Sequence, residues 1–340
     1  MTDVLAQAGD TLTDAPSPPR GGAVRYVLGK IGSAITSVVL VVMLGFLLFR
    51  VIPGDPVQTM TRGRPVSPEQ IEELRAQLGL DRSVPAQFLD YLVNLVQGDF
   101  GESYKYRRPV SDVILGALGP TVLLVGTATV LAVLLGLWLG TRSAWRRGSR
   151  FDRVSTGVAL TLWSVPAFWL GLLLLMVTGG LFPSGQMTSA DTPPDFLSQA
   201  LDVAHHMVLP TITLIAVIYA QYQLVMRSSL LEEMDADYLT TARAKGLRDD
   251  LVRRRHAVPN ALLPTVTLVF LHLGMVVAGA ITVETVFTWP GLGRLTYDAL
   301  QTPDLPLLQG TFIVLAAAVV TLNLLADLLY RVLDPRVRAA

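Results

Sequence analysis

Hydrophobic residues gather in six long runs, and polar segments separate these runs. The runs cover residues 31–52, 121–141, 154–181, 207–226, 262–288 and 309–331. About 20 mainly apolar residues cross the hydrocarbon core of a bilayer as a helix, so each run predicts a transmembrane helix. The third and fifth runs exceed one straight crossing, and we expect them to tilt or to extend beyond the membrane. Pro166 is expected to kink the third helix. The pattern predicts an all-α integral membrane protein with six spans.

Lysine and arginine are distributed unevenly among the polar segments. If the N-terminus lies inside, 18 of the 27 basic residues fall in cytoplasmic segments, and the two short outer loops hold only Arg294. An excess of Lys and Arg marks cytoplasmic loops, so we predict that both termini lie in the cytoplasm. Residues 1–30, with a proline-rich run from Pro16 to Pro19, are expected to form a disordered cytoplasmic tail rather than a signal peptide. Residues 332–340 are expected to form a second cytoplasmic tail.

The long outer segment, residues 53–112, contains two patterns that predict short helices. Ser67 to Gln70 has the form of a capping box with proline at the first helical position. Apolar residues then recur at helical spacing up to Gly79, which suits a helix C-cap. A second amphipathic stretch, residues 88–96, runs out at Gly98. These helices would suit the outer membrane surface, and the alternative is a structured loop that packs on the bundle.

The cytoplasmic loop at residues 227–261 predicts a compact helical element between two spans. Asp237 is placed to cap a helix over residues 238–245, and Gly246 is placed to end it. A second helix follows, with two candidate capping residues and an interrupting proline: Asp249, Asp250 and Pro259. The alternative is a basic surface helix that lies on anionic lipid.

Composition limits the chemistry that this chain can perform. The 340 residues are 51% hydrophobic and 16% charged, with no cysteine and a formal net charge of zero. The lack of cysteine excludes disulfides and thiolate metal sites, and the neutral balance argues against nucleic-acid binding. The sequence contains no Walker A loop, no HExxH motif and no nucleophile elbow. His205 and His206 are adjacent and point to different helix faces, which favours a helix-end pair over a metal site. We therefore expect no catalytic residue, cofactor or metal on this chain.

A few residues inside the predicted spans carry either charge or very small side chains. Glu284 and Asp327 lie near the ends of predicted spans, and we expect both to be interfacial residues satisfied by water, although intramembrane carboxylates are often functional. Gly136 and Gly140 in the second span predict close helix packing. The alternative is that small residues line a pathway.

Several motifs, in order along the chain, carry a resemblance to a known family. Asp237-Tyr238, Thr241 to Leu247 and Asn260 to Pro264 resemble the EAA loop of ABC-importer permeases, specifically those of the dipeptide, oligopeptide and nickel group. Four further stretches match that group: Pro53 to Pro56, Leu78 to Asp81, Gly98 to Ser103 and Phe168 to Gly171. The most specific single match is Glu284 to Gly293. The resemblance covers nearly the whole chain from about residue 25. Two departures are Thr240 at the position of the EAA glutamate and Val258-Pro259 where a basic residue is common.

The resemblance implies a type I ABC-importer permease in the cell membrane of a prokaryote. It implies a second homologous permease, two ATPase subunits that hold ATP and Mg, and an extracellular substrate-binding protein as partners. The implied cargo is a di- or oligopeptide. The alternatives are nickel or another small chelate carried by the same architecture, and an ATP-independent carrier or channel.

The resemblance also implies roles for three groups of residues. A coupling helix that contacts an ATPase subunit would comprise Asp237, Tyr238, Thr241, Ala242, Arg243, Ala244, Lys245, Gly246 and Leu247. A pathway or gate would include Gly274, Ala278, Glu284, Thr288, Trp289, Pro290 and Gly291. A dock for the binding protein would include Pro53, Gly54, Asp55, Pro56, Gly98, Asp99, Glu102 and Ser103.

Overall fold

The structure is a computed structural model of the chain, and it describes residues 22–51, 57, 67–77, 81–302 and 304–333. Its helices are α1 (Gly22–Val51), α3 (Pro68–Gln77), α4 (Val84–Val96), α5 (Val110–Trp145), α6 (Arg150–Ser164), α7 (Ala167–Thr178), α8 (Phe196–Met234), α9 (Asp237–Ala244), α10 (Asp249–Val252), a π-helical turn (Arg253–Ala257), α11 (Val258–Val286), α12 (Leu292–Gln301) and α13 (Leu305–Leu333). Within the described residues there is no named β-strand, so the predicted all-α fold is confirmed.

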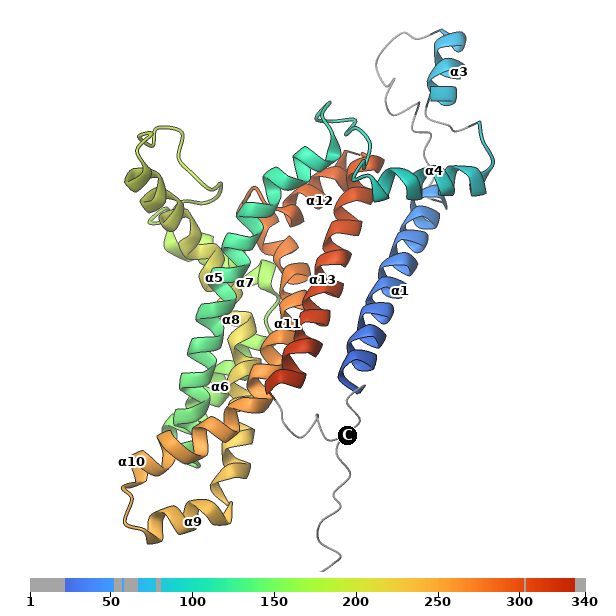
Figure 1. The fold of residues 1–340 in the computed structure, drawn as a ribbon. Helices are drawn as coiled ribbons and strands as arrows, with labels where there is room; N and C mark the ends of the chain where they lie inside the picture. The colour runs from blue at the N-terminus through green and yellow to red at the C-terminus, as the bar shows by residue number, and fades with distance from the viewer. Residues whose placement is uncertain (1–21, 52–56, 58–66, 78–80, 303, 334–340) are drawn as a thin grey trace, which may run out of the picture.

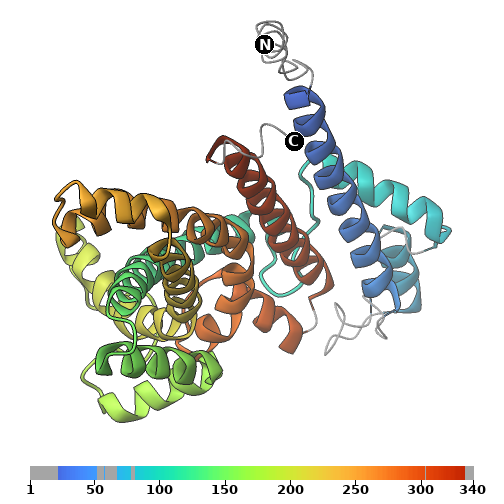
Figure 2. The same ribbon diagram turned by 90° about the horizontal axis from the view of Figure 1, so that it is seen from below.

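The long helices form an elongated bundle with short helices at both ends (Figure 1). α9 and α10 lie at one end of the bundle, and α12 and α4 lie at the other. α1 stands at the edge and packs on α13 (Figures 1 and 2). The predicted orientation places the α9 end in the cytoplasm.

The most extensive helix pair joins α5 to α8 through two glycines. A Cβ atom added at Gly136 would lie 2.7 Å from the Tyr222 Cβ, and one added at Gly140 would lie 2.6 Å from the Gln223 carbonyl oxygen. Only glycine lets the two backbones approach this closely, which is the packing role that the sequence predicts.

The third predicted span differs from the single tilted helix expected over residues 154–181. α6 and α7 are separate helices, bent by 105° at the break between them. Val165 is extended (φ −86°, ψ 130°) and Pro166 is the N-cap of α7. The residue before a proline avoids the helical region, so the expected kink becomes a complete break.

Several helices extend beyond the apolar runs that predict them. α1 begins at Gly22, inside the segment predicted as a tail, while α5 and α8 are 36 and 39 residues long. An apolar run measures the hydrocarbon crossing only, and the helical backbone continues past it. Within the described residues, α1, α5, α8 and α13 are each long and apolar enough to cross a membrane, and the α6–α7 pair is a fifth candidate. α11 covers most of the fifth predicted span but includes side chains outside the described set, so the number of spans stays a prediction.

The predicted capping box at the start of α3 is present in both directions. The Ser67 backbone N–H donates to the Gln70 Oε1 at 3.0 Å, and the Gln70 N–H donates to the Ser67 Oγ at 3.3 Å. The α3 cap at Gly79 lies outside the described residues. α4 ends before Gly98, which adopts φ +78°, and its Phe88 ring lies 5.1 Å from the Phe46 ring of α1. α4 therefore packs on the bundle.

Candidate functional site

The helix α9 ends in a Schellman motif that fixes the turn after it. The Gly246 N–H donates to the Arg243 carbonyl at 2.9 Å, and the Leu247 N–H donates to the Ala242 carbonyl at 3.3 Å. Gly246 adopts φ +82°, as the predicted glycine terminator requires. Leu247 packs against the hydrophobic cluster that contains Ala242. The motif turns the chain sharply into α10.

The predicted caps at the starts of α9 and α10 are wrong in detail. α9 begins at Asp237 with Ala236 as its N-cap, and α10 begins at Asp249 with Arg248 as its N-cap; neither cap makes a side-chain hydrogen bond. Both aspartates lie in the first turn instead. A carboxylate there is favoured by the helix dipole, which explains why the sequence signal lies one residue away from the cap.

α9 is amphipathic, and its buried side attaches it to the bundle. Leu239 and Ala242 are buried in a cluster with residues of α5, α8, α10, the π turn and α11, including Met226, Leu230 and Ala257. The opposite side of the element is exposed, and it carries Asp237, Tyr238, Thr241, Arg243, Ala244, Lys245 and Gly246. The structure therefore places seven of the nine predicted coupling residues on one accessible surface.

Tyr238 ties the exposed side of α9 to the two helices that flank the loop. Its hydroxyl donates to a Glu233 carboxylate oxygen on α8 and accepts from the Asn260 Nδ2 on α11 at 2.9 Å. Partial burial, and then the hydrogen bond to Glu233, raise the pKa of the Tyr238 phenol above its usual value. These bonds hold the start of α9 at a fixed position relative to α11.

The second cytoplasmic helix is continuous with α11, contrary to the expected interruption at Pro259. Residues 253–257 form a π-helical turn between α10 and α11, and Pro259 lies in the first turn of α11. A proline lacks an N–H donor and clashes with the carbonyl four residues before it, and a wider turn accommodates both defects. α10, the π turn and α11 thus form one unbroken helical path, which begins just after the turn that ends α9.

A partly buried ion pair joins α6 to α8 near the same end, and the sequence patterns do not single it out. The Arg227 guanidinium donates to both Asp152 carboxylate oxygens, at 2.7 and 2.9 Å, and Asp152 is 3% exposed. Asp152 also accepts from the Gly148 N–H at 2.9 Å. A basic residue just after an apolar run was the available signal, but nothing in the sequence pairs it with a carboxylate 75 residues away.

At the opposite end, Glu284 is a buried residue and not the water-satisfied interfacial one expected. It is 0% exposed, and its carboxylate accepts from the Thr121 hydroxyl at 2.7 Å, the Gly293 N–H at 2.7 Å and the Arg294 N–H at 3.1 Å. The Leu292 N–H donates to the Thr121 Oγ1 at 2.7 Å. Glu284 and Thr121 together satisfy the first three N–H groups of α12, which otherwise lack partners at a helix start.

The rest of the motif that follows Glu284 is folded around this cap. The Trp289 indole is fully buried and donates to the Pro120 carbonyl at 2.9 Å. A Cβ atom at Gly291 would lie 2.3 Å from a Glu284 carboxylate oxygen, so glycine is needed there. Thr288 adopts φ +47°, and its hydroxyl accepts from the Gln186 N–H at 3.0 Å. We call Thr121, Glu284 and residues 288–294 the outer cap.

The predicted gate residues therefore fall into separate groups. Glu284, Trp289 and Gly291 are buried within the outer cap, while Thr288 and Pro290 are exposed. Gly274 and Ala278 lie on α11, and their surroundings are outside the described set. The structure brings five of the seven residues together, and two of these five have accessible surface.

Asp327 likewise differs from the expected water-satisfied residue. Its carboxylate forms an ion pair with the Lys30 ammonium at 2.7 Å, and both side chains are about one-third exposed. Because α1 begins before residue 31, Lys30 is on the helix and can reach α13.

One predicted docking residue is buried. Ser103 is 0% exposed and donates to the Asp304 carboxylate at 2.6 Å, and the same carboxylate accepts from the Lys105 N–H at 3.0 Å. Ser103 therefore fastens the turn before α5 to the start of α13. Gly98, Asp99 and Glu102 are exposed as a docking surface requires, and Pro53, Gly54, Asp55 and Pro56 lie outside the described residues.

Long apolar helices, with a short helical element at one end of the bundle and a buried cap at the other, define a multi-pass membrane protein. The model of the family described as "Binding-protein-dependent transport system inner membrane component" matches residues 132–339, and the model of its N-terminal part matches residues 23–125. The chain belongs to this family of transport permeases.

Curated bacterial proteins resemble the chain over almost their whole length. The dipeptide transport system permease protein DppB of Escherichia coli strain K12 is 39% identical over an alignment of 334 residues, and the match covers 92% of this chain and 98% of that protein. The di/tripeptide transport system permease protein DppB of Pseudomonas aeruginosa is 37% identical over 330 residues, with the same coverage. The glutathione transport system permease protein GsiC of Pectobacterium atrosepticum is 37% identical over 317 residues, again with 92% and 98% coverage.

Proposed function

We propose that the chain is a permease subunit of an ATP-driven importer of small peptides. The main observation in support of this proposal is the exposed side of α9, which is a fixed protein surface that projects from the basic end of a membrane bundle. The three relatives named above are permeases for dipeptides, di- and tripeptides, and glutathione, which are all small peptides. ATP and Mg bind on partner ATPase subunits, because this sequence has no phosphate-binding loop.

In this mechanism, the exposed surface of α9 binds to an ATPase subunit. Closure of the ATPase pair pushes α9, and the push passes to α11 by three routes: the Leu239 cluster, the bond from Asn260 to Tyr238, and the continuous helix through the π turn. Packed apolar contacts and hydrogen bonds between rigid helices transmit a displacement with little loss. α11 then moves against its neighbours and opens the pathway to one side.

At the outer end, the outer cap keeps α12 and the outer part of α5 attached to the end of α11, so that these parts move together. Exposed residues beside this region, Asp99 and Glu102 among them, contribute to the surface that receives an extracellular peptide-binding protein. A second permease completes the pathway, and both termini lie in the cytoplasm of a bacterial cell.

The proposal is tested by reconstitution of the complete transporter with its ATPase subunits and binding protein in proteoliposomes. A labelled dipeptide should accumulate only when ATP is present on the ATPase side, and this chain alone should transport nothing. Uptake by the chain alone would replace the proposal with an ATP-independent carrier, and uptake of nickel without peptide would change the cargo.

The coupling role of α9 has a sharper test in Gly246. Gly246→Trp places a bulky side chain where the Schellman motif needs φ +82°. We expect either that ATP hydrolysis persists without peptide uptake, or that the ATPase subunit is lost when the transporter is purified. Gly180→Trp is the matched control, because Gly180 also has positive φ (+89°) and open space around it but lies after α7, away from the turn that follows α9. Equal behaviour of the two variants would remove α9 from the coupling path.

A further inference from the structure

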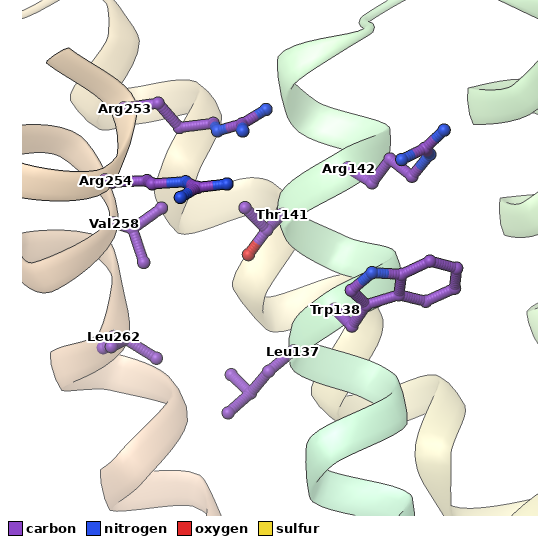
Figure 3. Close-up of a pocket in the computed structure, with 8 residues that line it drawn as sticks. All are labelled: Leu137, Trp138, Thr141, Arg142, Arg253, Arg254, Val258 and Leu262. Atoms are coloured by element: carbon purple, nitrogen blue, oxygen red, sulfur yellow. The ribbon is translucent and has the colours of Figure 1, made fainter. Parts of the chain in front are cut away.

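A cavity of about 510 Å³ lies between α5 and the start of α11, and no role described above uses it (Figure 3). Leu137, Trp138 and Arg142 line it from α5, and Arg253, Arg254 and Leu262 line it from the π turn and α11. Its volume falls within the range typical of small-molecule sites.

The cavity has a charged part and an apolar part. Figure 3 shows the Arg253 and Arg254 side chains reaching from the π turn toward α5, with the Leu137 and Leu262 side chains facing each other at a different level. The second predicted span ends at residue 141 and the fifth begins at residue 262. The arginines therefore lie just beyond the predicted inner membrane boundary, and the leucines lie just within it.

The arginines that line the cavity have guanidinium groups free to bind an anion. The Arg142 guanidinium carbon lies 5.9 Å from the centroid of the Trp138 ring and 5.3 Å from that of Phe151, and the Arg253 guanidinium carbon lies 5.7 Å from the centroid of the Trp145 ring. A ring holds the face of a guanidinium and leaves its N–H edges free for an anion. In the described part of the chain, no carboxylate forms an ion pair with Arg142, Arg253 or Arg254.

We propose that this cavity binds an anionic phospholipid of the inner leaflet, with its phosphate on Arg253 and Arg254 and the upper part of an acyl chain between Leu137 and Leu262. A phosphate matches the fork of N–H donors on arginine. A soluble anion would use the arginines only, whereas a lipid also fills the apolar part at the depth where its chains begin. Trp138, which is 57% exposed, is a side chain of the type that favours this interface.

The experiment uses the transporter purified with its partner subunits, stripped of lipid and titrated with phosphatidylglycerol or with phosphatidylcholine of the same chains. Native mass spectrometry counts the lipids retained. We expect phosphatidylglycerol to be retained preferentially, and the double variant R253Q/R254Q to weaken its binding by roughly fivefold for each arginine. The double variant R146Q/R147Q removes the same charge from exposed positions outside the cavity and should change binding by less than twofold.

A second variant distinguishes lipid binding in the cavity from general electrostatic attraction of anionic lipid to a basic surface. Thr141→Trp keeps every charge and fills the space between the arginines and the leucines, so phosphatidylglycerol retention should fall to the phosphatidylcholine level, while Thr141→Val should retain it. Equal losses in R253Q/R254Q and R146Q/R147Q, equal retention of the two lipids, or full lipid binding by Thr141→Trp would overturn the proposal. Displacement of the lipid by millimolar inorganic phosphate would assign the site to a soluble anion. If the Thr141→Trp variant lost the second permease while its lipid retention stayed unchanged, the site would be a protein contact.

Discussion

Glu284 illustrates how one buried carboxylate joins three parts of the chain that are distant in sequence. Thr121 of α5, Glu284 of α11 and the first turn of α12 meet in one set of hydrogen bonds. A carboxylate near a helix end is commonly hydrated, so the sequence alone favours a water-exposed residue. The decisive information is the return of α12 onto the carboxylate, which depends on Gly291 and Gly293. Those glycines are visible in the sequence, but only the fold shows that a side chain at either position would clash with the Glu284 carboxylate.

Replacement of Glu284 by alanine should lower the free energy of unfolding by about 3 kcal/mol, because two buried donors and one partly buried donor lose their acceptor. Glu284→Gln should recover most of this loss, since its amide oxygen can accept from α12 while its NH₂ donates to Thr121. Thermal unfolding in detergent measures both, and Asp298→Ala, which removes only a partly exposed ion pair of α12, should cost less than about 1 kcal/mol. Peptide uptake should survive in Glu284→Gln. A stable Glu284→Gln protein without uptake would instead give this carboxyl group a role in moving protons.

At the level of helices, the sequence predicts where helices form better than how they end or pack. The capping box of α3 and the glycine after α9 are local signals, because the interacting groups lie within a few residues, and both are present. The break at Pro166 and the π turn before Pro259 are different. At both places proline lacks an N–H donor and clashes with the preceding helical turn. Tertiary packing decides whether the helix breaks, as at Pro166, or widens into a π turn, as before Pro259. The partly buried pair of Asp152 with Arg227 has no local signal at all.

Two glycines of α5 give opposite predictions that test the α5–α8 packing. Gly140→Ala should lower the unfolding temperature, because its Cβ would lie 2.6 Å from the Gln223 carbonyl oxygen and 2.8 Å from the Met226 Cβ. Gly126→Ala lies on the same helix with open space around it, and it should be neutral or stabilise by up to about 1 kcal/mol through helix propensity. Parallel thermal unfolding of both variants provides the comparison. Equal effects would mean that α5 and α8 are not in close contact in the membrane.

A third helix-level prediction concerns Asp152 and Arg227. Asp152 is buried, whereas the Arg227 side chain is 26% exposed, so Asp152→Ala leaves a partly buried guanidinium without its partner and should cost about 2 kcal/mol of unfolding free energy. The double variant D152L/R227M should be more stable than D152A, since no unpaired charge remains. If the double variant loses as much as the sum of the single losses, the two side chains act independently.

At the scale of the whole molecule, a neutral total charge conceals two oppositely charged ends. The 27 acidic and 27 basic residues cancel, but the basic ones concentrate in the predicted cytoplasmic segments around α9 and the Arg253–Arg255 run, and acidic ones prevail in the outer segments. Long apolar runs and this asymmetry together predict the fold class and an orientation from sequence alone. Partner contacts are beyond such reasoning, because the exposed surface of α9 is defined only once Leu239 and Ala242 are seen to be buried.

The orientation can be tested directly because the chain contains no cysteine. A single cysteine at Asp99 should react with a membrane-impermeant maleimide added to intact spheroplasts, whereas one at Lys245 should react only after the membrane is permeabilised. Both side chains are exposed, so burial does not confound the comparison. The α9 end and the turn between α4 and α5 lie at opposite ends of the bundle, so labelling of both residues from outside would contradict a spanning bundle (Figure 1). Labelling of Lys245 alone from outside would reverse the orientation, and with it the assignment of α9 to an ATPase and of the arginine-lined cavity to the inner leaflet.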